Sequence, residues 1–247
     1  MSDSIVIIPT YNEKENITAI IQAVLSQPVL FDLLIIDDNS PDGTGQLVKD
    51  LQKNYIERLH LIERSGKLGL GTAYICGFEW CLKQGYTYIF EMDADFSHNP
   101  DDLCKLYESA KANAPALIIG SRYKSGVNVV NWSMNRILMS YYGSMYVRII
   151  SGIPVRDTTA GFVCYHRKIL ETIDFNKIRM KGYGFQIEMK FYTWKTGANI
   201  VEVPIIFTDR QKGTSKMSGG IFKEAIFGVL KMRLRSFFTK YPKLTSS

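Results

Sequence analysis

Cysteine and histidine are scarce in this 247-residue chain, which has four cysteines and three histidines. The cysteines show no CxxC pairing and no nearby histidine at a zinc-site spacing, and they are too sparse for a disulfide framework. We therefore predict free thiols in a reducing compartment. No Ser-His-Asp arrangement is visible either, and we assign catalysis to none of His60, His98 and His166.

Long apolar runs are also missing. No uninterrupted apolar stretch reaches the roughly 18 residues that a membrane-spanning helix needs. The first residues lead straight into an apolar, strand-like segment at 5–8, without the pattern of a signal peptide. We therefore expect a cytoplasmic protein whose contact with a membrane is peripheral, on the cytoplasmic face. Hydrophobic residues make up 46% and charged residues 22%, so a sizeable core can form.

Acidic residues are fewer than basic ones: the chain has 24 Asp and Glu and 30 Lys and Arg, which gives a formal net charge of +6. Such an excess favours an anionic partner, and charge alone leaves nucleic acid, acidic lipid and phosphorylated substrates open. The basic residues are dispersed and no nucleic-acid-binding motif is found. We therefore expect no nucleic-acid partner, although a basic nucleic-acid-binding protein is the alternative from another class.

The first half alternates short apolar segments with segments whose apolar residues recur at helical spacing. Strands are predicted at 5–8, 33–36, 59–63, 86–92 and 116–120, and helices at 13–27, 43–55, 71–83 and 101–112. Strands that are apolar on both faces and separated by helices indicate an α/β fold. Its mostly parallel, Rossmann-like central sheet would be covered by helices on both faces.

The second half is less regular. Helices are predicted at 132–150, 185–194 and 221–238, strands at 161–165 and 200–207, and a polar loop at 208–220. No linker or internal repeat divides the chain, so we predict a single domain over residues 1–247. Its catalytic core would span about residues 4–217, followed by an amphipathic helix at about residues 218–240.

Polar clusters follow three of the predicted strands, at 9–13, 37–43 and 93–95. The carboxyl ends of parallel strands share one edge of the sheet, where ligands bind. Alternation at a strand end would place Asp93 and Asp95, two residues apart, on the same side of the chain, where they could share a divalent cation. Mg²⁺ is held by one or two carboxylates together with substrate phosphates. The alternative is a capping loop before Asp101.

Asp38 lies where an acidic residue of a dinucleotide-binding fold contacts a ribose or a base. The segment 37–43 is also rich in turn residues, so Asp37 could be structural while Asp38 belongs to a site. The glycine-rich stretch 66–72 is not a P-loop, because no Lys-Ser or Lys-Thr pair follows its last glycine. It could be a tight turn or a helix start that approaches an anion.

Three basic residues stand apart from the rest of the charge. Arg122 follows a predicted strand, and Arg210 and Lys216 lie in the polar loop. A diphosphate leaving group gains negative charge as its bond to a sugar breaks, so cations placed around it lower the barrier. Arginine also binds phosphate through its two-pronged guanidinium group. A solvated basic loop is the alternative.

These segments together resemble the dolichyl-phosphate mannose synthases, which are family 2 glycosyltransferases with a GT-A fold. The resemblance runs in order through 9–13, 37–44, 69–73, 93–98, 120–123 and 210–216. It implies inverting transfer of mannose from GDP-mannose to a polyprenyl phosphate, with Mg²⁺ or Mn²⁺ as cofactor. A UDP sugar such as UDP-glucose as the donor is the alternative within the family. A sugar-nucleotide-binding regulator without turnover is the alternative outside it.

The resemblance also implies roles for individual residues. The donor nucleoside would be bound by Pro9, Tyr11, Glu13, Ile36 and Asp38. The metal and the diphosphate would be bound by Asp93 and Asp95, with a backbone contact from Ala94. The donor phosphates would be bound by Arg122, Arg210 and Lys216, and the acceptor phosphate by Arg136 and Ser140. Among these, Asp93, Asp95, Arg122 and Arg210 would carry catalysis.

The sequence departs from its relatives at three places. Ser97 stands where some relatives carry glutamine, which leaves a third metal ligand open, and 157–163 differs from the corresponding segment of the family. Many relatives also have C-terminal membrane spans, whereas none is predicted in this sequence.

Because the acceptor tail is insoluble, a membrane surface is an expected partner, through the helices at 221–238 and 132–150. Packing of the first on its own core is the alternative, and a small membrane subunit is a further partner left open.

Overall fold

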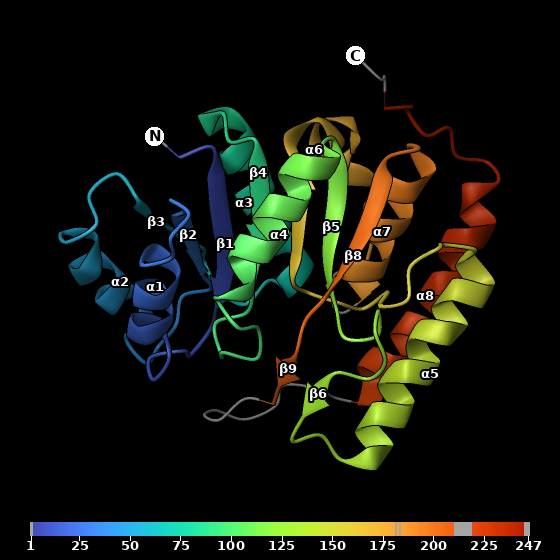
Figure 1. Ribbon diagram of the computed structural model, residues 1–247, viewed down its shortest axis with the longest axis horizontal. Helices are drawn as coiled ribbons and strands as arrows, with labels where there is room; N and C mark the ends of the chain where they lie inside the picture. Colours follow the sequence, from blue (N-terminus) through green and yellow to red (C-terminus); the bar gives the residue numbers. More distant parts are fainter. Residues whose placement is uncertain (1, 181, 183, 210–218, 245–247) are drawn as a thin grey trace.

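The computed structural model describes residues 2–180, 182, 184–209 and 219–244, the last stretch with side chains from residue 227 on (Figure 1). A seven-stranded sheet with the order β3-β2-β1-β4-β7-β5-β8 forms its centre. The strands are β1 (Ser4–Thr10), β2 (Asp32–Asp37), β3 (Leu59–Glu63), β4 (Tyr88–Glu91), β5 (Ala116–Ser121), β7 (Val163–His166) and β8 (Asn199–Pro204). The predicted mostly parallel sheet is confirmed.

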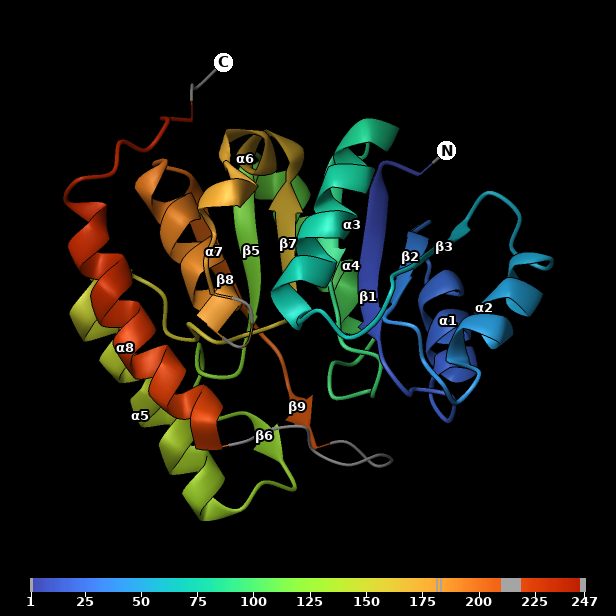
Figure 2. The same ribbon diagram turned by 180° about the vertical axis from the view of Figure 1, so that it is seen from behind.

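Helices cover both faces of this sheet, and α5 and α8 pack at one end of the molecule. They are α1 (Ile17–Leu25), α2 (Thr44–Gln52), α3 (Leu70–Gln84), α4 (Asp102–Asn113), α5 (Met134–Ser151), α6 (Arg167–Thr172), α7 (Gly184–Lys195) and α8 (Gly219–Ser236), with a short 3₁₀ helix η1 (Phe175–Lys177). Figure 2, the view from behind, brings α3 and α7 to the front, whereas α1 and α4 lie in front in Figure 1.

Successive side chains of a strand point to opposite faces of the sheet, and this produces one core layer on each face. In β1, Ile5 and Ile7 pack with residues of α3 and α7, whereas Val6 and Ile8 pack with residues of α1 and α4. All four side chains are fully buried. A strand buried on both faces reads as a continuous apolar run, which is why β1, β2 and β5 were recognisable in the sequence.

One strand of the sheet runs against the others. β7 pairs antiparallel with β4 and with β5, whereas β8 pairs parallel with β5. The sequence predicted a strand here but not its direction. The short helix α6, which follows β7 directly, was not predicted either.

The strand predicted at 200–207 is divided in two. β8 ends at Pro204, whose side chain excludes an amide N–H and so cannot extend the ladder as a donor. The chain then leaves the main sheet, and β9 (Phe207–Thr208) pairs in parallel with β6 (Val129–Val130). This two-stranded sheet lies beyond the carboxyl ends of the main strands, between them and the start of α5 (Figure 1).

α5 and α8 run side by side at one end of the molecule in both views (Figures 1 and 2). Val229 and Met232 of α8 form a small core with Val147 of α5 and with Ile187 and Phe191 of α7. Both helices also carry exposed apolar side chains on their outer surfaces. Within the described residues, no helix combines the length and the apolar character that crossing a bilayer requires.

Candidate active site

The loops after β1 and β2 are tied together at the edge of the sheet where parallel strands end. The amide of Glu13 donates to Thr44 Oγ1 at 3.0 Å, and the amide of Lys14 donates to Asp42 Oδ2 at 3.0 Å. Helix α1 starts only at Ile17, later than the sequence suggested, because the preceding residues form these loop contacts. The two segments predicted to bind a nucleoside therefore lie next to each other.

Asp38 forms a buried, bidentate ion pair with Arg64. Arg64 Nε lies 2.6 Å from Oδ1 and Nη2 lies 2.8 Å from Oδ2, and both side chains are less than one-tenth exposed. Arg64 Nη1 also donates to Thr72 Oγ1, 2.8 Å away in α3. The sequence analysis did not single out Arg64. Its only signal was its place directly after a strand, like that of Asp38.

Asp37 has a structural role, as its turn-rich surroundings suggested. Its carboxylate accepts hydrogen bonds from Thr10 Oγ1 at 2.8 Å and from Ser40 Oγ at 2.6 Å, and so holds the loop after β2. Its neighbour Ile36 is opposite Pro9 in the register of β1 and β2. The Ile36 side chain is fully buried in the core, so a predicted contact of Ile36 with a nucleoside could come only from its main chain.

The glycine-rich stretch lies beside the loop after β1. Lys67 Nζ lies 5.0 Å from the centre of the Tyr11 ring, a cation–π contact. The stretch ends in a helix start, because α3 begins at Leu70 directly after Gly69, whose φ is +105°. A β-carbon at Gly71 would lie 2.7 Å from the Phe185 ring, so glycine is needed for α3 to pack against α7.

The predicted metal-binding pair lies in a bend rather than in a strand. β4 ends at Glu91, and the chain turns through Phe96, which has a φ of +59° that non-glycine residues rarely adopt. Asp95 is largely buried and accepts the Ser97 amide at 3.1 Å through Oδ1. The Asp93 side chain is 42% exposed, and Ala94 between them is buried. Residue alternation in a strand is therefore not what places the two carboxylates.

His98 supports this bend by packing between the Asp93 main chain and the Phe162 ring. Its Nδ1 accepts the Asp93 amide at 3.2 Å, and its ring stacks on Phe162 with 5.0 Å between the centroids. Burial lowers the pKa of His98 below its ordinary value, against the opposing effect of the nearby Asp93 carboxylate. A neutral imidazole is what an Nδ1 acceptor requires. The sequence analysis assigned His98 no role in catalysis, and its contacts are those of a support for Asp93.

The carboxylates at this bend fit a hard divalent cation. In the part of the chain that the structure describes, no group of three or more His, Cys, Asp or Glu side chains could hold a metal ion by itself. Asp93 and Asp95 offer the small set of oxygen ligands that Mg²⁺ uses when substrate phosphates complete its coordination. The buried Ser97 hydroxyl beside them, which has no hydrogen-bond partner among the described residues, is another available oxygen.

Arg122 is held rigidly by Asp157. Its Nε and Nη2 donate to the two carboxylate oxygens at 2.7 and 2.6 Å, and its own amide donates to Oδ2 at 2.9 Å. Burial of Asp157 acts to raise its pKa, but the charge and hydrogen bonds of Arg122 outweigh this, so the pKa lies below its ordinary value. The guanidinium also lies against the rings of Trp132 and Phe207. The segment 157–163 thus contributes the residue that orients Arg122.

The residues predicted to contact an acceptor phosphate lie one turn apart on α5, next to this ion pair. Arg136 Nη1 lies 2.6 Å from Asp209 Oδ2, and its guanidinium stacks 4.1 Å from the centre of the Trp132 ring. Ser140 Oγ lies 2.7 Å from the hydroxyl of Tyr123, the residue after Arg122. The structure therefore brings Arg136 and Ser140 close to Arg122. Arg210 and Lys216 lie outside the described residues.

A buried polar network that was not predicted from the sequence lies next to the bend after β4. The Gln186 amide hydrogen-bonds to Glu91, and Lys190 Nζ donates to the Ala160 carbonyl at 2.6 Å. Burial raises the pKa of Glu91 and lowers that of Lys190, and the charge of each opposes the shift of the other. This network joins β4, α7 and the segment that carries Asp157.

Acidic residues and arginines thus lie at the carboxyl edge of a largely parallel α/β sheet, where ligands bind in folds of this class. The sequence model described as "Glycosyl transferase family 2" matches residues 5–174. The chain belongs to this family, as the order of its motifs predicted.

Two curated relatives resemble the chain over nearly its whole length. The polyprenol monophosphomannose synthase of Mycolicibacterium smegmatis is 44% identical over 94% of this chain and 87% of the relative. The undecaprenyl-phosphate mannosyltransferase of Micrococcus luteus is 44% identical over 92% of this chain and 93% of the relative.

Solved structures confirm the fold. Glucosyl-3-phosphoglycerate synthase from Mycobacterium tuberculosis in complex with uridine-diphosphate superimposes with a TM-score of 0.68 at 16% identity, covering 93% of this chain and 80% of that one. The same enzyme in complex with Mn²⁺, uridine-diphosphate-glucose and glycerol 3-phosphate gives a TM-score of 0.66 at 16% identity, covering 93% and 79%.

Proposed function

We propose that this protein transfers mannose from GDP-mannose to a polyprenyl phosphate, with inversion at the anomeric carbon and release of GDP. The observation that carries the proposal is the proximity of Arg136 and Ser140 on α5 to Arg122, which supports an acceptor-phosphate site beside the predicted diphosphate site. The names of the two relatives at 44% identity, a polyprenol monophosphomannose synthase and an undecaprenyl-phosphate mannosyltransferase, support the choice of sugar and acceptor.

The donor nucleoside would lie across the ends of β1 and β2. Pro9, Tyr11 and Glu13 would line one side of it. The Asp38 carboxylate, fixed by Arg64, would accept hydrogen bonds from the base, and a guanine offers N–H donors for such a contact. The buried pair would then contribute to the choice of nucleotide, because Arg64 fixes the position of the Asp38 oxygens and a base without N–H donors at that position forms no hydrogen bond with them.

Replacing Asp38 with asparagine is expected to weaken GDP-mannose binding on the order of tenfold, with a smaller effect on kcat, since it removes a charge-assisted hydrogen bond to the base. GDP titration calorimetry and the donor KM measure this effect. The matched control is Asp50→Asn, which changes an exposed carboxylate on α2. Unchanged GDP affinity in Asp38→Asn would remove Asp38 from the donor site.

Asp93 and Asp95 would hold Mg²⁺ or Mn²⁺, and this cation would neutralise charge developing on the departing diphosphate. Glucosyl-3-phosphoglycerate synthase, which has a similar fold, binds Mn²⁺ together with uridine-diphosphate-glucose, and this supports the proposal of a divalent cation here. Arg122 would present its guanidinium to the donor phosphates in an orientation fixed by Asp157. Arg210 and Lys216 are proposed to add positive charge there.

The acceptor phosphate is itself the nucleophile. It is anionic near neutral pH, so the step needs no general base. Arg136 and Ser140 would orient one phosphate oxygen for in-line attack on the anomeric carbon. The new bond joins that oxygen to the anomeric carbon, while the bond to the diphosphate breaks and its electron pair leaves with GDP. Attack opposite the leaving group inverts the configuration.

The acceptor's lipid tail requires a bilayer, and α5 and α8 are proposed to contact it. Their exposed apolar side chains recur at helical spacing, and they are Met134, Leu138, Tyr142, Met145 and Ile149 on α5 and Phe227, Leu230 and Leu234 on α8, with Phe237 directly after the end of α8. α8 also packs on the core through Val229 and Met232, as the alternative interpretation of this helix predicted, and the proposed membrane contact uses its exposed side chains. Location on the cytoplasmic face and help from a small membrane subunit remain parts of the proposal.

A transfer assay tests this function directly. Purified protein is incubated with a short-chain polyprenyl phosphate, Mg²⁺ or Mn²⁺, and either GDP-mannose or UDP-glucose. We expect a mannosylated lipid phosphate from GDP-mannose alone, no product after chelation with EDTA, and recovery when either metal is restored. The one-bond carbon–proton coupling constant at the anomeric centre of the product should show inversion relative to the donor.

The alternative donor gives a distinct result in the same assay. Product from UDP-glucose alone would retain the mechanism but overturn the assignment of GDP-mannose. Full activity in EDTA would overturn the role of the cation at Asp93 and Asp95, and retained configuration would overturn in-line attack by the acceptor phosphate.

A further inference from the structure

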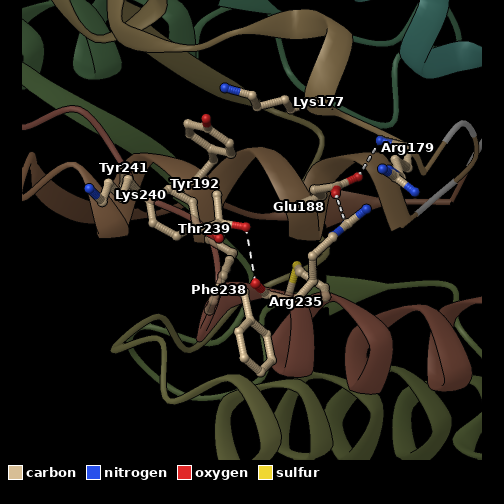
Figure 3. Close-up of a pocket in the computed structure, with 11 residues that line it drawn as sticks. Lys177, Arg179, Glu188, Tyr192, Arg235, Phe238, Thr239, Lys240 and Tyr241 are labelled. Carbon is tan, nitrogen blue, oxygen red and sulfur yellow. Dashed lines mark hydrogen bonds and ion pairs between the residues drawn. The ribbon is translucent and has the colours of Figure 1, made fainter.

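A pocket lies away from the carboxyl edge of the sheet, between η1, α7 and the end of α8 (Figure 3). Its volume is about 490 Å³, and it shares no lining residue with the donor and acceptor sites proposed above. The lining combines the basic side chains of Lys177, Arg179, Arg235 and Lys240 with the aromatic ones of Phe191, Tyr192, Phe238 and Tyr241. We refer to it as the α7–α8 pocket.

The α7–α8 pocket carries surplus positive charge. Its one carboxylate, Glu188, is 4% exposed and lies 2.8 Å from Arg235 Nη2. The amides of Arg179 and Met180 also donate to Glu188 at 2.8 Å each. Glu188 is therefore neutralised by groups around it, and it fixes Arg235 against α7.

Three further cations surround the pocket. Figure 3 shows Lys177 above Tyr192, Arg179 beyond Glu188, and Lys240 on the opposite side. Lys177 has a surface partner, Asp174, at 3.2 Å, and both of those side chains are largely exposed. An exposed ion pair of this kind is weak and can be displaced by a stronger anion.

Tyr192 adds an unsatisfied polar group. The residue is 5% exposed, and its hydroxyl has no hydrogen-bond partner among the residues that the structure describes. Figure 3 shows the phenol directed toward the side on which Lys177 lies. A buried donor without an acceptor is costly, and an anionic oxygen in the pocket would supply that acceptor.

The pocket opens beside an apolar edge. Phe238, which lines it, is 92% exposed and follows Phe237 at 67% and Leu234 at 63%. These side chains continue the exposed apolar surface of α8. Cations next to exposed aromatic and aliphatic side chains are what an interfacial segment presents to an anionic lipid.

We propose that the α7–α8 pocket binds the phosphate headgroup of an anionic membrane phospholipid, with Phe237 and Phe238 contacting its acyl chains. The proposal rests on the membrane contact proposed for α5 and α8. It adds a defined anion site, distinct from the acceptor site, that would anchor the C-terminal end of α8 at the bilayer.

Vesicle binding of a triple variant tests the pocket. Lys177→Gln, Arg179→Gln and Lys240→Gln together remove the three outer cations and leave the Glu188–Arg235 pair in place. At about 1 kcal/mol per basic residue near an anionic surface, partitioning to phosphatidylcholine vesicles containing phosphatidylglycerol should fall on the order of 100-fold. Co-sedimentation or flotation measures this. Binding to pure phosphatidylcholine vesicles should change little.

A second triple variant has the same net charge as the first, and its residues lie on α5, on α8 and in the C-terminal segment. Arg148→Gln, Lys231→Gln and Lys243→Gln remove exposed cations that do not line the pocket. We expect this control to retain most of the binding to phosphatidylglycerol vesicles. Equal losses in the two triple variants would overturn the pocket and leave only diffuse attraction between the protein and the membrane.

Dissolved phosphate separates the two sources of the anion. If inorganic phosphate raises the melting temperature of the wild type but not of the pocket variant, while both bind vesicles equally, the ligand is a free phosphate and the lipid assignment fails. The wild-type transfer assay with a short-chain acceptor is read separately. If it shows no transfer, the proposed function fails, but the vesicle comparison still tests the pocket.

Discussion

Replacing Asp95 with asparagine should lower kcat/KM for mannosyl transfer on the order of 1000-fold, the scale of losing one preorganised electrostatic group at a reacting centre. The amide oxygen of asparagine can still accept the Ser97 amide, which Asp95 Oδ1 now accepts at 3.1 Å. The bend should therefore keep its shape and lose only the charge that is proposed to bind the cation and the diphosphate. The transfer assay, with circular dichroism to verify folding, measures this.

Asp101→Asn is the matched control for this variant. Asp101 belongs to the turn before α4, and its Oδ1 accepts a hydrogen bond from Gln27 at 3.1 Å. If the acidic residues after β4 served only as a loop before that helix, Asp95→Asn and Asp101→Asn would behave alike. Near wild-type transfer by Asp95→Asn would contradict the metal and diphosphate role.

Replacing Asp157 with asparagine should lower the free energy of unfolding by about 3–5 kcal/mol, the usual cost of breaking a buried ion pair from one side. The variant leaves the Arg122 guanidinium, whose side chain is 10% exposed, without the charge that compensates it. Urea denaturation followed by tryptophan fluorescence measures the loss. Asp174→Asn removes an exposed carboxylate and should leave the unfolding midpoint unchanged.

The stabilising effect of Asp157 should also depend on pH. Its pKa in the folded protein is lowered, so the Arg122–Asp157 pair contributes fully above the unfolded-state value of about 4 and loses its contribution as pH falls through the folded-state pKa. Wild-type stability should therefore fall more steeply in acid than that of Asp157→Asn. Adding Arg122→Gln to Asp157→Asn should recover part of the lost stability, because no buried charge then stays unpaired. Parallel acid profiles and no recovery would show that the pair does not act as a buried ion pair.

Most of the architecture could be predicted from local sequence signals. β1, β2 and β5 are buried on both faces, and the periodicity of α1 and α4 matched helices that cover one face. The reversed direction of β7 could not be predicted, because strand direction depends on which neighbours a strand pairs with. The break at Pro204 was visible as a residue, but its effect depends on a second sheet formed with residues far away in the chain.

The site shows the same division between local and non-local information. The segments containing Asp38, Asp93 and Arg122 were found because each follows a strand. Their partners Arg64, His98 and Asp157 were not identified as partners. Arg64 and Asp157 form ion pairs with segments distant in sequence, and His98 contacts Asp93 only because the chain bends between them. For Asp93 and Asp95, strand alternation was the wrong reason for a pairing that the resemblance also implied.

The order of strands in the sheet has a consequence for how this enzyme could diversify. The proposed nucleoside loops belong to the β3-β2-β1 edge, whereas α5, which carries Arg136 and Ser140, lies toward the opposite end (Figure 1). The bend after β4, the central strand of the sheet, lies between the two regions. Changes of donor at one edge and changes of lipid at the other can therefore accumulate as separate modules, each leaving the reacting centre between them intact.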